Sequence, residues 1–177
     1  MGRTLKDNIG EFLTLIGEDR DREGLSETPS RVSKAWKELL TSEKFKLTTF
    51  DSQGYDEMII SRDIKYYTFC EHHLLPFFGV AHVGYIPNGK IIGLSKLARL
   101  VDYYSKRLNT QEYFTDNIAS ALNATLNPKG IGVIVEGRHL CQEMRGIKIR
   151  GSMITSKLKG VFLEDHKVKQ EFFKLCK

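Results

Sequence analysis

Residues 64–92 read IKYYTFCEHHLLPFFGVAHVGYIPNGKII and contain the pattern that decides the fold. Over residues 64–69, the side chains of Ile64, Tyr66 and Thr68 alternate with those of Lys65, Tyr67 and Phe69. This alternation predicts a half-buried strand. A second strand is expected over residues 77–86. The turn signal Pro87-Asn88-Gly89-Lys90 then leads to a short strand at residues 91–92. The stretch therefore predicts antiparallel hairpin structure.

Helical patterns stand on both sides of this strand region. Before it, apolar residues at helical spacing predict a short helix over residues 5–16, and Thr28-Pro29 predicts the N-cap and first position of a second helix. After it, Ser95 occupies an expected N-cap position before a helical stripe that extends to Leu108. A further helix is expected over residues 111–126.

The C-terminal part of the chain adds two strands and a last helix. Residues 131–136 form a short apolar run of the length expected for a buried strand, and residues 153–158 form another candidate strand. Asp165 is expected to cap a final helix. The order of elements predicts an α+β domain with a mainly antiparallel sheet.

Length and composition suit one compact domain with a small helical extension. The chain has 177 residues, 41% of them hydrophobic, which is enough for a real core. Residues 41–55 show no sustained period and are predicted to be a linker. The expected division is therefore an N-terminal helical extension and linker over residues 1–55 and the main domain over residues 56–177, which carries the candidate catalytic residues described below.

Charge and cysteine content narrow the class of protein. The formal net charge is +5, and the basic residues are interspersed with acidic ones, which favours a polyanionic ligand without choosing between nucleic acid and nucleotide. No apolar run approaches the roughly 18 residues that cross a bilayer, and no signal-peptide pattern opens the chain, so a cytoplasmic protein is expected. Three Cys make disulfide stapling a poor explanation and turn attention to metal or thiol chemistry.

The segment Cys70-Glu71-His72-His73 is the strongest chemical signal. Cys and His three residues apart can share one metal ion, and zinc favours thiolate with imidazole, keeping a fourth position for water in catalytic sites. His139-Leu140-Cys141 also follows a predicted strand, so Cys141 is the natural third ligand and His139 a nearby acid or base. On spacing alone, a buried thiol beside a hydrogen-bonded histidine explains the pattern equally well.

A second group of residues suits a nucleotide. Lys96 and Arg99 stand at the start of a predicted helix, where free N–H groups and the helix dipole favour phosphate, and Arg145 could add a bidentate contact. Gln111 and Glu112 could accept hydrogen bonds from the N–H edge of a guanine. Taken without the metal loops, these residues fit a solvated basic helix face better.

Several separate motifs, in the same order, resemble the GTP cyclohydrolase I family. Cys70-Glu71-His72-His73-Leu74-Leu75-Pro76-Phe77 is similar to its metal loop, and the resemblance runs from about Ile9 to the C-terminus. The other matching motifs are Gly17-Glu18-Asp19, Asp21-Arg22-Glu23-Gly24-Leu25, Glu27-Thr28-Pro29, Arg31-Val32, Ile92-Gly93-Leu94-Ser95-Lys96-Leu97-Ala98-Arg99, Gln111-Glu112, His139-Leu140-Cys141, Met144-Arg145-Gly146 and Gly160-Val161-Phe162.

The resemblance implies a fold, an assembly and a reaction. The family has the tunnelling fold, an antiparallel sheet with two long helices packed on it, in which sheets from several subunits close into a barrel. It implies a homodecamer of two pentamers with active sites between subunits and one Zn²⁺ per subunit. The implied reaction converts GTP and water to 7,8-dihydroneopterin triphosphate and formate, for folate or deazapurine synthesis.

The resemblance also implies a role for each matching residue. The implied zinc ligands are Cys70, His73 and Cys141, and the implied proton-transfer pair is His72 and His139. The residues implied to bind the triphosphate are Ser95, Lys96, Arg99 and Arg145, with Arg31 contributed across an interface. The residues implied to bind the guanine are Gln111 and Glu112.

Two features depart from the usual family pattern. Residues 147–154 are slightly shorter than the usual spacing and altered in composition, which affects the loop near the triphosphate and so substrate affinity or oligomer packing. The N-terminal segment is short, so little room is expected for a regulatory extension and allosteric regulation is not expected.

Three other interpretations remain open at this stage. A related tunnelling-fold enzyme, such as the nitrile reductase of queuosine synthesis, uses a Cys nucleophile and NADPH instead of a metal. A basic zinc-stabilised module could bind nucleic acid, although structural zinc closes all four positions and no second nearby C-x-x-C is present. A variant of the cyclohydrolase could release formate and stop before pterin closure. Fe(II) or Mn(II) could also occupy the same ligands.

Overall fold

The computed structural model describes residues 2–177, which divide into two compact units that meet between Thr41 and Ser42. The first unit contains helices α1 (Leu5–Leu15) and α2 (Thr28–Leu39). Thr4 caps α1 by accepting a hydrogen bond from the Asp7 N–H, and the Asp7 carboxylate accepts one from the Thr4 N–H. The prediction of Thr28 as the N-cap of α2 was one residue late, because Glu27 is the N-cap.

The second unit is built on a five-stranded sheet with the order β5-β2-β3-β6-β7. All neighbouring strands are antiparallel except β5 and β2, which are parallel. The strands are β2 (Ile59–Cys70), β3 (Pro76–Ile86), β5 (Leu108–Asn109), β6 (Gly130–His139) and β7 (Met153–Gly160). The predicted α+β class with a mainly antiparallel sheet is therefore confirmed.

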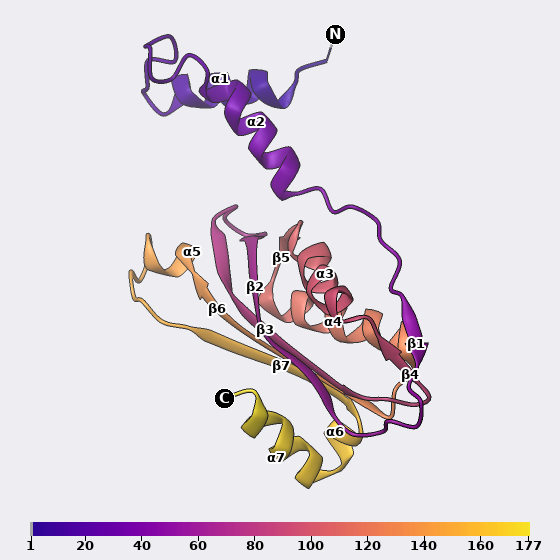
Figure 1. Ribbon diagram of the computed structural model, residues 1–177. Coiled ribbons are helices and arrows are strands. Elements are labelled where there is room, and N and C mark those ends of the chain that lie inside the picture. The colour runs from indigo at the N-terminus through magenta and orange to yellow at the C-terminus, as the bar shows by residue number, and fades with distance from the viewer. Residues whose placement is uncertain (1) are drawn as a thin grey trace. The chain divides into compact units, whose positions relative to one another are not determined.

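Helices cover both faces of this sheet (Figure 1). The long helices α3 (Leu94–Ser105) and α4 (Gln111–Leu126) pack on one face, where they bury the larger hydrophobic core. On the other face, α6 (Val161–Glu164) and α7 (His166–Leu175) bury a smaller core around Phe162 and Phe172. A sheet with two long helices packed on it is the arrangement that the tunnelling fold requires.

Strand β6 is buried on both faces, which explains its continuous apolar run. Val133 and Val135 belong to the larger core, whereas Ile134 between them belongs to the smaller one. Successive side chains of a strand point to opposite faces, so a central strand covered on both sides needs apolar residues throughout. The structure extends the strand beyond the predicted residues 131–136 at both ends.

Two local predictions were wrong. The short strand β4 (Lys90–Ile92) does not form a hairpin with β3, because β2 and β6 already occupy both edges of β3. It pairs instead with β1 (Thr49–Asp51), which lies in the segment predicted to be a linker. Ser95 was predicted to be the N-cap of this helix, but it is the second residue of α3, whose N-cap is Gly93.

The sequence has no apolar run long enough to predict a membrane-spanning helix, and the structure agrees for the part of the chain that it describes. Among residues 2–177, no helix has both the length and the apolar composition needed to cross a bilayer.

The smaller core generates a stability prediction. Phe162 has none of its surface exposed and meets the ring of Phe172 edge-on at a centroid distance of 5.1 Å. We expect Phe162→Ala to lower the free energy of unfolding by about 3–5 kcal/mol, because it leaves a cavity. Leu163→Ala, at the adjacent position with 62% exposure, should cost less than about 0.5 kcal/mol. Urea unfolding measures both, and equal losses would contradict this packing.

Candidate metal centre and active site

The ends of two strands bring the predicted metal ligands together. Strand β2 ends at Cys70 and β6 ends at His139, and both pair with the start of β3. In the register, Phe69 lies opposite Pro76, and Phe77 lies opposite His139. Residues that follow β2 and β6 therefore lie on either side of the same short segment of β3, although they are far apart in the chain.

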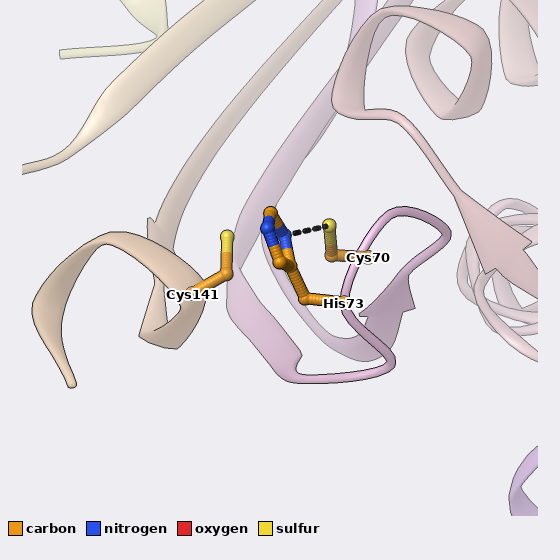
Figure 2. A group of neighbouring side chains, drawn as sticks. All are labelled: Cys70, His73 and Cys141. Carbon is orange, nitrogen blue, oxygen red and sulfur yellow. Dashed lines mark hydrogen bonds between the residues drawn. The ribbon is translucent and has the colours of Figure 1, made fainter. Parts of the chain in front are cut away.

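Cys70, His73 and Cys141 form one compact cluster with the composition of a metal site. One ligand atom from each residue lies within 4.8 Å of the others. Figure 2 shows the His73 imidazole between the two thiols, with its Nδ1 atom 3.8 Å from Cys70 Sγ. Tetrahedral zinc with ordinary bond lengths would separate sulfur and nitrogen ligands by about 3.6 Å. The donor set and its spacing therefore fit a zinc ion with three protein ligands.

The loop that carries His73 is closed by its own backbone. The Cys70 N–H donates to the Leu75 carbonyl, and the Leu74 N–H donates back to the Cys70 carbonyl, both at 2.9 Å. Leu74 takes a left-handed conformation with φ of 55°, which turns the chain within a few residues. The Glu71 N–H donates to the Asn109 carbonyl at 3.1 Å and so ties the loop to β5.

Cys141, the third candidate ligand, is on the single-turn helix α5 (Leu140–Glu143), which follows β6 directly. Burial raises the pKa of the Cys141 thiol, and the neighbouring Cys70 raises it further. Cys141 therefore keeps its proton at neutral pH until a cation displaces it. Because a thiol must lose its proton to ligate a metal, we expect metal affinity to rise with pH.

His139 is held beside the cluster by the buried side chain of Gln111. The Gln111 amide nitrogen lies 3.0 Å from the Val135 carbonyl and 2.9 Å from the Met153 carbonyl, so it donates to both. Its oxygen must then face His139 Nε2, at 2.8 Å. A carbonyl oxygen accepts only, so Nε2 carries a proton and Nδ1 is the nitrogen that exchanges one. The ring stacks on Phe77 with a centroid distance of 4.4 Å.

The surroundings of His139 also set its protonation. Burial lowers the pKa of His139, and the Glu112 carboxylate partly opposes this by favouring the charged imidazole. The protonated form is therefore a stronger acid than an exposed histidine.

Gly137 makes this arrangement sterically feasible. A Cβ atom at this position would lie 2.4 Å from the Tyr66 hydroxyl oxygen and 2.6 Å from Gln111 Oε1. Any larger residue would push Gln111 away from His139. Glycine within a strand commonly marks such a close approach.

Comparison with known proteins identifies the family. Residues 5–177 match the family model described as GTP cyclohydrolase I. The chain belongs to the GTP cyclohydrolase I family. It is 50% identical to GTP cyclohydrolase 1 of Aquifex aeolicus over 98% of this chain and 95% of the relative. It is 51% identical to GTP cyclohydrolase 1 of Sulfurihydrogenibium sp. over 93% of this chain and 89% of that relative. Among solved structures, an archaeosine synthase QueF-Like aligns with 56% of this chain and 92% of its own, at 17% identity and a TM-score of 0.42.

The residues that the GTP cyclohydrolase I resemblance implies do not all lie together. At the metal end of the sheet, Gln111 and Glu112 begin α4, and Arg145 Nη1 lies 2.8 Å from His73 Nε2. His72 is also here, with its Nδ1 3.8 Å from Cys70 Sγ and its side chain exposed.

The residues that the resemblance assigns to the triphosphate and that belong to α3 lie toward the opposite end of the sheet. Leu94, the first residue of α3, borders a 390 Å³ apolar hollow together with Ile59 and Tyr85. Strand β2 runs from Ile59 to Cys70, which is a distance of roughly 35 Å for an extended strand. Ser95, Lys96 and Arg99 follow Leu94 directly. Arg31 is exposed on α2 in the N-terminal unit.

Sequence reasoning missed two residues that shape the centre. Gly137 could have been noticed as a glycine inside an apolar strand next to His139. Asn109 offered no such signal, because its role depends on tertiary contacts. Its amide nitrogen lies 2.9 Å from both the Thr68 hydroxyl and the Tyr104 carbonyl, and donates to both.

The two adjacent histidines provide a direct test of the ligand set. Both Nδ1 atoms are 3.8 Å from Cys70 Sγ, but only His73 is grouped with Cys141. We expect His73→Ala to weaken zinc binding by more than about 100-fold, since a ligand contributes more than the residues around it. His72→Ala should leave zinc affinity unchanged. Chelator competition measures both constants, and loss of zinc in the His72 variant instead would exclude this ligand set.

Proposed function

We propose that this chain converts GTP and water to 7,8-dihydroneopterin triphosphate and formate. Membership of the GTP cyclohydrolase I family at about half identity over nearly the whole chain supports this activity. The observation that carries the proposal is the Cys70, His73 and Cys141 cluster, with His139 fixed beside it. A three-ligand site next to an acid group is the arrangement expected for metal-assisted hydrolysis.

We propose that the ion is one zinc per subunit, held by Cys70, His73 and Cys141. Two thiolates and one imidazole favour zinc over magnesium or calcium, which prefer oxygen ligands. When bound, zinc would supply a Lewis acid that lowers the pKa of water to about 7 and so makes a nucleophile available at neutral pH.

His139 is proposed to donate the proton that makes the purine reactive. Protonation of N7 turns C8 into an electrophile, and a protonated Nδ1 of His139 is the free donor, because Nε2 is bonded to Gln111. The lowered pKa of His139 makes this donor stronger than an ordinary imidazolium. His72, exposed near the same cluster, is proposed to carry protons for the later opening and rearrangement of the ribose.

Gln111 and Glu112 are proposed to recognise the guanine. Glu112 is exposed at the start of α4, where its carboxylate is free to accept hydrogen bonds from the N–H edge of the base. Gln111 has only 1% of its surface exposed, and both ends of its amide are engaged. It can contact the guanine directly only by exchanging one of these bonds, and it otherwise acts on the base through His139.

The triphosphate site is proposed to be completed by neighbouring subunits. Ser95, Lys96 and Arg99 begin far from the metal cluster within one chain, whereas Arg145 lies next to it. In a homodecamer of two pentamers, α3 of one copy could approach the metal centre of the next, and Arg31 could be contributed in the same way. The edge position of β7, with Ile154 exposed, suits sheet continuation between copies.

The cellular setting is a further part of the proposal. Three free thiols fit a reducing compartment, so we place the enzyme in the cytoplasm. Its product would serve the synthesis of folate or of a deazapurine. An NADPH-dependent nitrile reductase is disfavoured by the family match and by the metal-like grouping of two Cys with a His.

The reaction is tested by incubating the zinc-loaded protein with GTP and assaying formate together with the fluorescent pterin formed after oxidation. We expect equal amounts of both products. Cys141→Ala should reduce both by more than about 100-fold, because the metal is lost. Cys176→Ala, which changes the third free thiol at the end of α7, should leave both unchanged.

The products distinguish the alternatives. Formate without pterin would identify a truncated reaction. Neither product from a folded, zinc-loaded oligomer would overturn the GTP assignment.

The shared site is tested by mixing two inactive variants. Lys96→Ala removes a proposed phosphate contact, and Cys141→Ala removes a metal ligand. An equal mixture of the two variants is dissociated and reassembled. If each site is formed by two copies, about a quarter of the sites should become active, because each neighbour supplies its intact residue with a probability of about one half. No recovery, in a mixture shown to contain hybrid oligomers, would place Lys96 and Cys141 of one chain in the same site.

A further inference from the structure

An ion pair brackets Cys141 on both sides in the chain. Arg138 lies on β6 three residues before Cys141, and Glu143 ends α5 two residues after it. Arg138 Nε donates to Glu143 Oε1 at 3.0 Å, and Nη2 donates to Oε2 at 2.6 Å. Two parallel charge-assisted bonds fix direction as well as distance. The pair therefore closes the turn that carries Cys141.

The Arg138 side chain packs on an aromatic ring, which in turn stacks on a second ring. Its guanidinium lies over the ring of Phe78, 5.5 Å from the centroid, and these two residues are directly opposite in the sheet. Phe78 stacks in turn on Tyr67, its partner on β2, at 5.9 Å and 26°. Three neighbouring strands thus support Arg138 on one face of the sheet.

Helix α5 needs such support because it is too short to hold its own shape. It has only four residues, and within residues 2–177 no side chain caps its N-terminus. A single helical turn gains little from cooperative hydrogen bonding. The direction of the Cys141 thiol therefore depends on what fastens the end of α5 to the sheet.

We propose that the Arg138–Glu143 pair is a positioning clamp that holds Cys141 in the geometry needed for the metal. This inference rests on the proposed metal site and goes beyond it, because neither residue touches the ligand cluster as a ligand. Glu143 is 13% exposed and Arg138 is 38% exposed, so this bidentate pair is partly shielded from solvent and holds the turn more firmly than an exposed ion pair would. Its effect falls on metal affinity, which depends on how closely the ligands are preorganised.

The Arg138→Gln variant distinguishes the clamp from a simple effect of charge, because the two explanations predict opposite changes in zinc affinity. If the two side chains acted only by their fields, Glu143→Gln would weaken binding of a cation and Arg138→Gln would strengthen it. The clamp predicts that both variants weaken binding. It also predicts that the double variant is no weaker than either single one, since the interaction is already lost.

The experiment measures zinc affinity by chelator competition in the full-length protein. We expect Arg138→Gln and Glu143→Gln each to weaken zinc binding about tenfold, at the lower end of the range for residues around a metal site. The double variant should also be about tenfold weaker. As a control, Asp56→Asn removes the more exposed Lys129–Asp56 ion pair near the opposite end of β6, about 30 Å away, and should leave zinc affinity unchanged.

Several results would overturn the clamp. Unchanged or tighter zinc binding by Arg138→Gln would do so, as would a double variant weakened by the product of the single effects. A lowered unfolding temperature of the metal-free variants with unchanged zinc affinity would show a structural role only. Cys141→Ala separates this outcome from failure of the metal site itself, because full zinc affinity in that variant would refute the site and not the clamp alone.

Discussion

The register of β3 between β2 and β6 is the constraint on which the active-site geometry depends. It places Phe69 opposite Pro76 and Phe77 opposite His139, so that the chain leaves β2 and β6 at neighbouring points. Because side chains alternate between faces, a slip of one residue along β6 would move His139 to the face that Arg138 occupies and Arg138 to the face that His139 occupies. Close packing enforces this register, since a Cβ on Gly79 would lie 1.9 Å from the Glu136 carbonyl oxygen.

The alternation also separates two tasks on the two faces of β6. On the face covered by α4, His139 meets the buried amide of Gln111, which links the start of that helix to β6 and β7. On the opposite face, Arg138 lies on Phe78 and reaches forward to Glu143. Cys141 follows both residues. The proposed proton donor His139 and the proposed metal ligand Cys141 are thus oriented by different contacts, although a single residue separates them in the chain.

Much of the fold followed from periodicity, and the exceptions have physical causes. The strands over residues 77–86 and 131–136 and the helix over residues 111–126 were predictable because their apolar spacing reflects burial. The partner of β4 was not, because a turn signal does not say which edges of a strand are already occupied.

The site was predictable in its chemistry but not in its distribution. Cys70, His73 and Cys141 carry a donor pattern that zinc prefers, and the structure groups them. Spacing could not reveal that Gln111 faces His139, since this depends on carbonyls of β6 and β7 that accept from its amide. Nor could it reveal that Ser95, near the start of α3, lies far from the Cys70, His73 and Cys141 cluster of the same chain. That separation follows from the direction in which α3 returns along the sheet.

The proposed reaction requires the Cys70, His73 and Cys141 cluster to hold a catalytic metal with one position left open. X-ray absorption at the zinc edge of the loaded protein tests it most directly. We expect two sulfur ligands at about 2.3 Å, one imidazole nitrogen at about 2.0 Å and one further oxygen that exchanges with solvent. A shell of four protein ligands, or one made only of oxygen and nitrogen, would contradict it.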